Sequence, residues 1–280
     1  MFDQFTLEHI DVGEATLRVR HGGDGPPIVL LHGHPRTHVT WYRVAPALAA
    51  GHTVVCPDLR GYGQSSKPAS DDYSKRAMAG DIRVLMAELG HERFAVAGHD
   101  RGCYVAMRLA LDHPDAVTHL GVLDGVPIGE ALARADARFA ALWWHWFFLG
   151  QTEKPAEPII NADPAAWYRL DSVDPVVRED LRAAVMDPAT VHAMVSDYRA
   201  GLRADRANDD ADRAAGRKIG CPTLFCWSTR DDMAELYGDP ASIWRDWADD
   251  LVSVAIESGH HMAEENPSAL TDALRDLLTR

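Results

Sequence analysis

Six short runs of apolar residues recur along the chain, and helical patterns lie between several of them. Continuous apolar runs of this length are typical of strands that are covered on both faces. The amphipathic pattern over 78–89 ends at Gly90, and further helical patterns cover 104–111 and 269–278. This alternation predicts an α/β fold with a mostly parallel sheet flanked by helices. The six expected strands are 28–31, 53–56, 94–97, 119–123, 223–227 and 252–256.

Two segments depart from the alternation. The chain before the first of these strands contains a turn signal at 24–27, which predicts an antiparallel hairpin at the sheet edge. Residues 129–217 contain no convincing buried strand and are punctuated by prolines, so we expect a helical insertion between the fourth and fifth strands. The predicted domains are therefore a core of 1–128 and 218–280 and a helical cap, or lid, of 129–217.

The net charge and the composition limit the classes of partner and the cellular locations that are expected for the protein. Lys and Arg number 28 against 42 Asp and Glu, a net charge of −14, which disfavours nucleic acid and anionic membranes as partners. The acidic N-terminus has no signal-peptide pattern, and the apolar stretch 139–149 is too short to span a bilayer. The 4 cysteines form no CxxC pair, so free thiols and a cytoplasmic location are expected.

The chemistry centres on residues 98–102, Gly-His-Asp-Arg-Gly, between an expected strand and an expected helix. The spacing is that of a nucleophile elbow, with Asp100 in the nucleophile position. The alternative is a simple helix cap. A carboxylate can displace a leaving group from a saturated carbon, and water can then hydrolyse the resulting ester. Asp100 therefore indicates substitution at a carbon–halogen bond or an epoxide.

The ester requires a base that activates water. His260 follows the last expected strand and is the first choice, with His261 as the alternative; both could also be surface histidines. A carboxylate should orient this histidine. Asp124 follows the fourth expected strand, and Asp231 and Asp232 follow the fifth, at the edge where such sheets place their sites. The choice between the two positions, Asp124 and Asp231, stays open, with Asp124 favoured.

The turn His-Gly-His-Pro at 32–35 follows the first buried strand. The backbone amides of His34 and Arg101 are the expected oxyanion donors. The His34 side chain itself could simply pack or face solvent. We expect no metal and no organic cofactor, because the sequence has neither a metal-spaced cluster of ligands nor a phosphate-binding glycine loop.

These blocks, together with Asp-Leu-Arg-Gly-Tyr-Gly-Gln-Ser-Ser at 58–66 and Ser-Gly-His-His at 258–261, resemble the α/β-hydrolase superfamily. Arg101, the run 144–147 and the segment 197–201 narrow the resemblance to the fluoroacetate (haloacetate) dehalogenases within the epoxide hydrolase-like branch. That family implies a homodimer and favours Asp124 as the acid. It also implies that Arg101 holds the substrate carboxylate, while His145, Trp146 and Tyr198 bind the departing halide.

One position departs from the family pattern. Tyr104 stands where the family usually has a second arginine, and a phenol gives one hydrogen bond rather than a charged clamp. Arg36, next to the His-Gly-His-Pro turn, is a candidate replacement. The substrate thus stays open among 2-haloacids, larger halogenated acids and neutral haloesters. The predicted substrate-binding residues are Arg101, Tyr104, His34, His145, Trp146 and Tyr198.

The functional hypothesis is a hydrolytic dehalogenase of small 2-haloacids that works through an aspartyl ester, with water as the second reactant. The alternative is an epoxide hydrolase, in which Tyr168 and Tyr198 would protonate the epoxide oxygen. Against this alternative, an arginine beside the nucleophile serves little purpose for a neutral epoxide. A third reading is a binding protein without activity, which an intact Asp–His pair disfavours.

Overall fold

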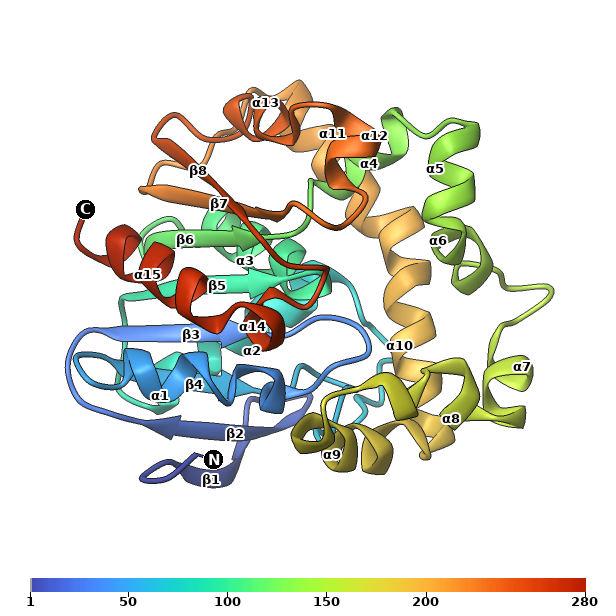
Figure 1. The fold of residues 1–280 in the computed structure, drawn as a ribbon, viewed down its shortest axis with the longest axis horizontal. Helices are drawn as coiled ribbons and strands as arrows, with labels where there is room; N and C mark the ends of the chain where they lie inside the picture. Colours follow the sequence, from blue (N-terminus) through green and yellow to red (C-terminus); the bar gives the residue numbers. More distant parts are fainter. Residues whose placement is uncertain (1) are drawn as a thin grey trace.

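A computed structural model describes residues 2–280 and contains one eight-stranded sheet (Figure 1). The strand order is β1-β2-β4-β3-β5-β6-β7-β8, and all pairs from β4 to β8 are parallel. The six predicted strands correspond to these six parallel strands, which confirms the predicted α/β fold. The strands are β1 (Thr6–Asp11), β2 (Thr16–Gly22), β3 (Pro27–Leu31), β4 (Thr53–Pro57), β5 (Phe94–His99), β6 (Val117–Leu123), β7 (Thr223–Ser228) and β8 (Leu251–Ile256).

The predicted hairpin exists at the sheet edge, but its turn was placed wrongly. β1 and β2 pair antiparallel through a turn at 12–15, where the Gly13 amide donates to Asp11 Oδ1 at 2.8 Å. Gly13 has a φ of +101°, a backbone conformation that would be strained in a residue with a side chain. The predicted turn at 24–27 instead joins β2 to β3. These two strands are not neighbours, because β4 lies between them.

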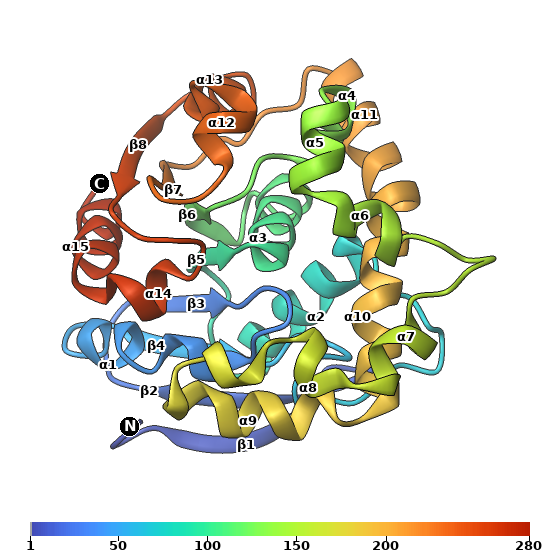
Figure 2. The same ribbon diagram turned by 45° about the vertical axis from the view of Figure 1, so that its right-hand side comes forward.

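Helices cover both faces of the sheet (Figure 2). α2 (Lys75–Glu88) and α3 (Arg101–Asp112) pack on one face, and α1 (Val44–Leu48) and α15 (Pro267–Leu278) on the other. β5 is fully buried between them, in agreement with its unbroken apolar sequence. The remaining short helices of this part are η1 (His38–Trp41), α12 (Met233–Tyr237), α13 (Pro240–Arg245) and α14 (Met262–Glu265).

Between β6 and β7 the regular elements are all helices, and this insertion lies beyond the C-terminal ends of the parallel strands (Figure 1). Several of its prolines mark helix starts, since α8, α9 and α10 each begin with a proline behind a capping aspartate. The insertion contains α4 (Ile128–Ala133), α5 (Ala137–Leu142), α6 (Trp144–Leu149), α7 (Glu157–Ala162), α8 (Pro164–Trp167), η2 (Leu170–Ser172), α9 (Pro175–Val185), α10 (Pro188–Ala200), η3 (Gly201–Asp205) and α11 (Arg206–Ala214).

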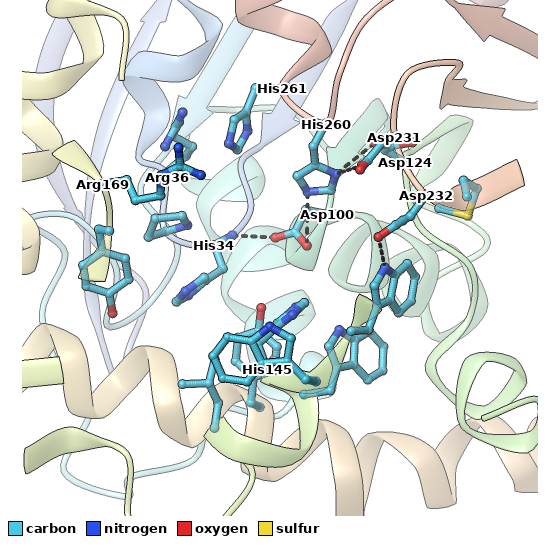
Figure 3. Close-up of a pocket in the computed structure, with 18 of the residues that line it drawn as sticks. His34, Arg36, Asp100, Asp124, His145, Arg169, Asp231, Asp232, His260 and His261 are labelled. Atoms are coloured by element: carbon cyan, nitrogen blue, oxygen red, sulfur yellow. Dashed lines mark hydrogen bonds and ion pairs between the residues drawn. The ribbon is translucent and has the colours of Figure 1, made fainter. Parts of the chain in front are cut away.

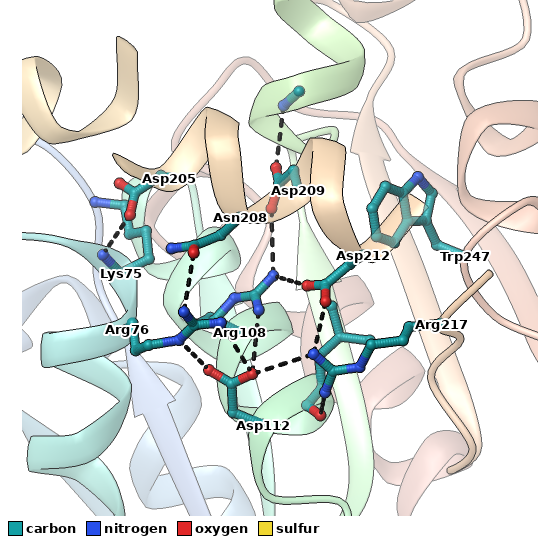
Figure 4. A network of polar contacts seen from close by, with 12 residues as sticks. Lys75, Arg76, Arg108, Asp112, Asp205, Asn208, Asp209, Asp212, Arg217 and Trp247 are labelled. Carbon is teal, nitrogen blue, oxygen red and sulfur yellow. Dashed lines mark hydrogen bonds and ion pairs between the residues drawn. The ribbon is translucent and has the colours of Figure 1, made fainter. Parts of the chain in front are cut away.

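A buried ionic network joins the end of the insertion to the core (Figure 4). Arg108 on α3 contacts Asp112 at 3.1 Å on its own helix, and Asp209 and Asp212 on α11 at 3.4 and 2.5 Å. Asp209 also accepts from the Gly129 amide at 3.0 Å. Burial raises the pKa of Asp209 to about 6. The guanidinium thus links both ends of the insertion to α3.

The sequence also led to expectations about the cysteines and about membrane-spanning helices. Three cysteines are buried and Cys221 is half-buried, all four as free thiols, as predicted. No helix within residues 2–280 combines the length and the apolar character that a membrane span requires.

Candidate active site

A pocket of about 410 Å³ lies between the strand ends and the insertion (Figure 3). Its lining includes most of the predicted site residues, from segments far apart in the sequence. Two sets can be distinguished by origin. The strand ends contribute His34, Asp100, Asp124, Asp231 and His260, and the insertion contributes His145, Trp146 and Tyr198.

The nucleophile position is a strained turn between β5 and α3. Asp100 has a φ of 51°, which is unfavourable for a residue with a side chain and costs on the order of 1–3 kcal/mol. A Cβ on Gly98 would lie 2.1 Å from the carbonyl oxygen of Gly102, so the tight turn excludes a side chain there. The two glycines of the motif therefore allow Asp100 to project into the pocket.

The Asp100 carboxylate has two fixed neighbours. Its Oδ1 accepts from the His34 amide at 2.6 Å, and its Oδ2 lies 3.7 Å from His260 Nε2. Burial alone would raise the pKa of Asp100, but the hydrogen bond and charge of His260 outweigh it and hold this pKa well below its usual range. The carboxylate is therefore ionised, as a nucleophile requires. Arg101, whose amide is the second predicted oxyanion donor, begins α3 directly after it.

His260 is held by two carboxylates rather than one. Its Nδ1 lies 2.9 Å from Asp124 Oδ2 and 2.8 Å from Asp231 Oδ2. Asp124 is fully buried and also accepts from the Ser228 amide and hydroxyl, both at 2.9 Å. The structure thus brings both candidate acids to the same ring. His261 lies beside this ring, and its backbone amide donates to Glu265 Oε1 at 3.3 Å. Among residues 2–280, its buried Nδ1 has no hydrogen-bond partner, so no acid orients this ring through Nδ1.

Electrostatics around His260 favour its charged form. Burial lowers the pKa of the imidazole, but hydrogen bonds with Asp100, Asp124 and Asp231 raise it well above its usual value. Next to this group, burial and the charge of Asp231 raise the pKa of Asp232 to about 6. Asp232 accepts from Trp143 Nε1 at 2.7 Å, which ties the insertion to the loop after β7.

The three predicted halide ligands lie together in the pocket wall. The His145 and Trp146 rings lie 5.8 and 6.5 Å from the Tyr198 ring. Burial lowers the pKa of His145 to about 4, so its imidazole is neutral at pH 7. Within the described chain, residues 2–280, none of these three side chains has a hydrogen-bond acceptor. Their N–H and O–H groups are thus available to an anion.

Arg101 lies behind the pocket wall and is not among the lining residues. Its guanidinium donates to Asp197 Oδ1 at 2.7 Å, Oδ2 at 3.2 Å and the backbone oxygen at 3.0 Å. Lys75 and Tyr62 also contact the Asp197 carboxylate. The Tyr198 ring covers the guanidinium at 4.2 Å. The contact of Arg101 with a substrate carboxylate therefore stays a prediction, and this geometry gives it little support.

The two other residues considered for carboxylate binding do line the pocket. Tyr104 places its phenol there, with no acceptor among residues 2–280. Arg36 is bound by Glu264 through two hydrogen bonds of 2.8 and 3.2 Å, so its charge is already balanced. Neither residue reproduces a free guanidinium beside the nucleophile.

Several lining residues have no signal in the sequence that marks them. Trp143 and Asp232 meet across 89 positions, and no local pattern predicts that contact. Arg169 has a φ of 48°, a left-handed backbone that its residue type does not predict, so its place at the pocket has no signal in the sequence either. The signal for Tyr168 was only its type, a tyrosine in the insertion.

Comparison with known proteins gives consistent results. The alpha/beta hydrolase fold family model matches residues 26–267. Fluoroacetate dehalogenase from Burkholderia sp is 40% identical, covering 100% of this chain and 95% of the relative. Soluble epoxide hydrolase from Corynebacterium sp. is 35% identical, with 89% of each chain covered. The crystal structure of a putative alpha/beta hydrolase from Nostoc sp PCC 7120 is similar, with a TM-score of 0.96, 38% identity and 100% of both chains covered. The chain therefore belongs to the alpha/beta hydrolase fold family.

Proposed function

We infer that the protein is a hydrolytic dehalogenase of halogenated carboxylic acids. The observation that carries this proposal is an ionised Asp100 in the same pocket as three unpaired donors, those of His145, Trp146 and Tyr198. A carboxylate nucleophile needs a saturated carbon with a leaving group. Neutral N–H and O–H groups without acceptors suit a halide that gains charge as it leaves.

In the first step, an Asp100 carboxylate oxygen attacks the halogen-bearing carbon from the side opposite the halogen. A carbon–oxygen bond forms, and the carbon–halogen bond breaks with its electron pair on the halide. The His145, Trp146 and Tyr198 donors stabilise that charge. Trp146 and Tyr198 are buried, and hydrogen bonds from a wall of low polarity are stronger than they would be in solution.

Forming the ester removes the Asp100 charge that favours protonated His260, so the imidazole can release its proton to solvent. In the second step, the neutral His260 removes a proton from water, and the oxygen attacks the carbonyl carbon of the Asp100 ester. The His34 amide, at 2.6 Å from Asp100 Oδ1, is placed to stabilise the oxyanion, together with the Arg101 amide. The ester bond to the substrate oxygen then breaks, and His260 returns the proton to the alcohol. Asp124 and Asp231 hold the ring throughout. The sum is haloacid plus water giving hydroxyacid, halide and a proton.

We also propose a division of the chain into two domains. The helices of 129–217 act as a cap domain over a core of 1–128 and 218–280, because they supply the halide-binding side chains. The partners are a halogenated acid and water, with no metal or organic cofactor in the reaction. From the family resemblance we also propose a cytoplasmic homodimer.

The test is halide release from fluoroacetate, chloroacetate and bromoacetate by the purified protein. Asp100→Ala should release none. His260→Gln should release one halide per active site and then stop, because its ester on Asp100 is not hydrolysed; peptide mass analysis would locate the ester. Steady turnover by Asp100→Ala would exclude this mechanism.

A second candidate function, epoxide hydrolysis, is favoured by one observation. Tyr168 and Tyr198 both line the pocket, and burial raises the pKa of both phenols, so each stays protonated and can donate to an epoxide oxygen. Styrene oxide hydrolysis that is lost in Tyr168→Phe and in Tyr198→Phe, without halide release from any haloacid, would establish this function instead.

A further inference from the structure

One end of the pocket combines a cation with unpaired donors. His34 follows β3, and Tyr168 and Arg169 follow α8; all three line the pocket. The His34 and Tyr168 rings lie 5.7 Å apart. Figure 3 shows Arg169 on the His34 side of the cavity, away from Asp231 and Asp232. The pocket therefore has a basic end and an acidic end.

Two groups at the basic end are buried without a partner. The Tyr168 hydroxyl has no hydrogen-bond partner although its residue is only 8% exposed, and the buried His34 Nδ1 has none either. Burial lowers the pKa of His34 to about 3, so the ring is neutral, and it raises the pKa of the Tyr168 phenol. Leaving such groups unpaired is unfavourable, which points to a ligand that accepts hydrogen bonds.

Arg169 supplies the charge. It has no acidic partner among residues 2–280, whereas Glu264 neutralises Arg36 and Asp197 neutralises Arg101. Its backbone is left-handed, and hydrogen bonds fix it on both sides, from its amide to the Ala166 oxygen at 3.1 Å and from the Ser172 amide to its own oxygen at 2.9 Å. The side chain therefore leaves the backbone at a defined point on the pocket rim.

We propose that Tyr168 and Arg169, with the His34 imidazole, form the carboxylate-binding site of the substrate. Tyr168 and Arg169 follow α8 of the insertion rather than the strand end that carries Asp100, so this site favours haloacids longer than two carbons, with the halogen on a carbon remote from the carboxylate, over haloacetates. The pocket volume of about 410 Å³ is in the range of pockets that hold drug-sized ligands, which are larger than a haloacetate. The carboxylates of Asp231 and Asp232 at the opposite end disfavour the reversed orientation. The inference rests on the proposed dehalogenase function.

The kinetic test compares chloroacetate, 6-chlorohexanoate and the neutral 6-chlorohexanamide. Arg169→Gln should raise the KM for 6-chlorohexanoate about tenfold while kcat changes little, because the lost interaction is a hydrogen bond to a charged group remote from the reacting carbon. The KM for the amide should not change. The control is Arg182→Gln, an exposed arginine on α9 outside the pocket lining, which removes the same charge. An equal effect of Arg169→Gln on acid and amide, or no effect on either, would overturn the inference.

A second measurement does not depend on turnover. Calorimetric titration should show that the wild-type protein binds hexanoate more tightly than hexanamide, and that Arg169→Gln, but not Arg182→Gln, removes this preference. Tyr168→Phe should weaken hexanoate binding. Absence of a preference in the wild type, or its persistence in Arg169→Gln, refutes the carboxylate site. If the wild type releases no halide from any compound, the dehalogenase proposal fails, and the titration still decides whether this end binds carboxylates.

Discussion

The two carboxylates on His260 lead to a quantitative prediction for Asp231→Asn. His260 must be neutral to accept the proton of water, so kcat should rise with pH as the imidazole loses its own proton. Asp231 favours the protonated ring from 2.8 Å. Removing its charge makes deprotonation easier, and the acidic limb of the kcat profile should therefore move to lower pH.

The size of this shift follows from Coulomb's law. At 2.8 Å the attraction is about 1.5 kcal/mol with the dielectric constant of water, and about four times as large at an effective value of about 20. The Asp231 side chain is 28% exposed, so solvent screens the pair in part and the value for water is the lower limit. It corresponds to a shift of at least about one pH unit.

The assay is kcat for halide release between pH 5 and 10. The plateau should fall less than tenfold, because Asp124, held by Ser228, still accepts from Nδ1. Asp272→Asn, an exposed carboxylate on α15, removes the same charge and should not move the limb. A limb that stays in place in Asp231→Asn, or moves to higher pH, would show that Asp231 does not act on His260 in the ester.

Three further predictions concern the halide site and the ionic network. Trp146→Phe removes one donor and should slow halide release about tenfold or more, with fluoride affected more than bromide; equal effects on all halides would argue against indole–halide contact. Arg108→Met leaves Asp209 without a cationic partner and Asp212 with Arg217 alone. It should lower the free energy of unfolding by about 3–5 kcal/mol in urea titrations at pH 7.5, against less than about 1 kcal/mol for the exposed Arg206→Met. The pKa of Asp209 in the folded protein, about 6, lies above its ordinary value, so the folded state binds this proton more tightly than the unfolded state does. The stability of the wild type therefore declines as the pH rises through about 6. An Asn at this position does not titrate, so the Tm of Asp209→Asn should increase relative to that of the wild type between pH 4.5 and pH 8.

Local patterns were sufficient to predict the sheet and the two central catalytic candidates. The runs at 94–97 and 223–227 are mostly apolar because both faces of these strands are covered. A few adjacent residues are therefore enough to indicate that the strands are buried. The elbow at Asp100 and the loop at His260 each depend on a few consecutive residues. These features require no knowledge of distant contacts.

Other features depend on contacts between distant segments, and they could not be predicted. Asp197 neutralises Arg101 across 96 positions, so the same arginine that suggested a carboxylate clamp is already paired. The choice between Asp124 and Asp231 had no local answer, because the ends of β6 and β7 meet at one imidazole. The turn at 24–27 was misassigned because β4, which is later in the sequence, separates β2 from β3.

The ion pair between Arg101 and Asp197 also determines how the pocket can admit a substrate. It joins the residue after the nucleophile to α10, and Lys75 on α2 contacts the same carboxylate. Lifting α10 off the core would separate buried charges, at a cost of about 3–5 kcal/mol, so that between about one molecule in 150 and about one in several thousand would be open at any time. Substrates then pass through the rim near the exposed Trp144 and Arg169, and the amide hydrogens of α10 should exchange with solvent at least about a hundredfold more slowly than those of exposed loops.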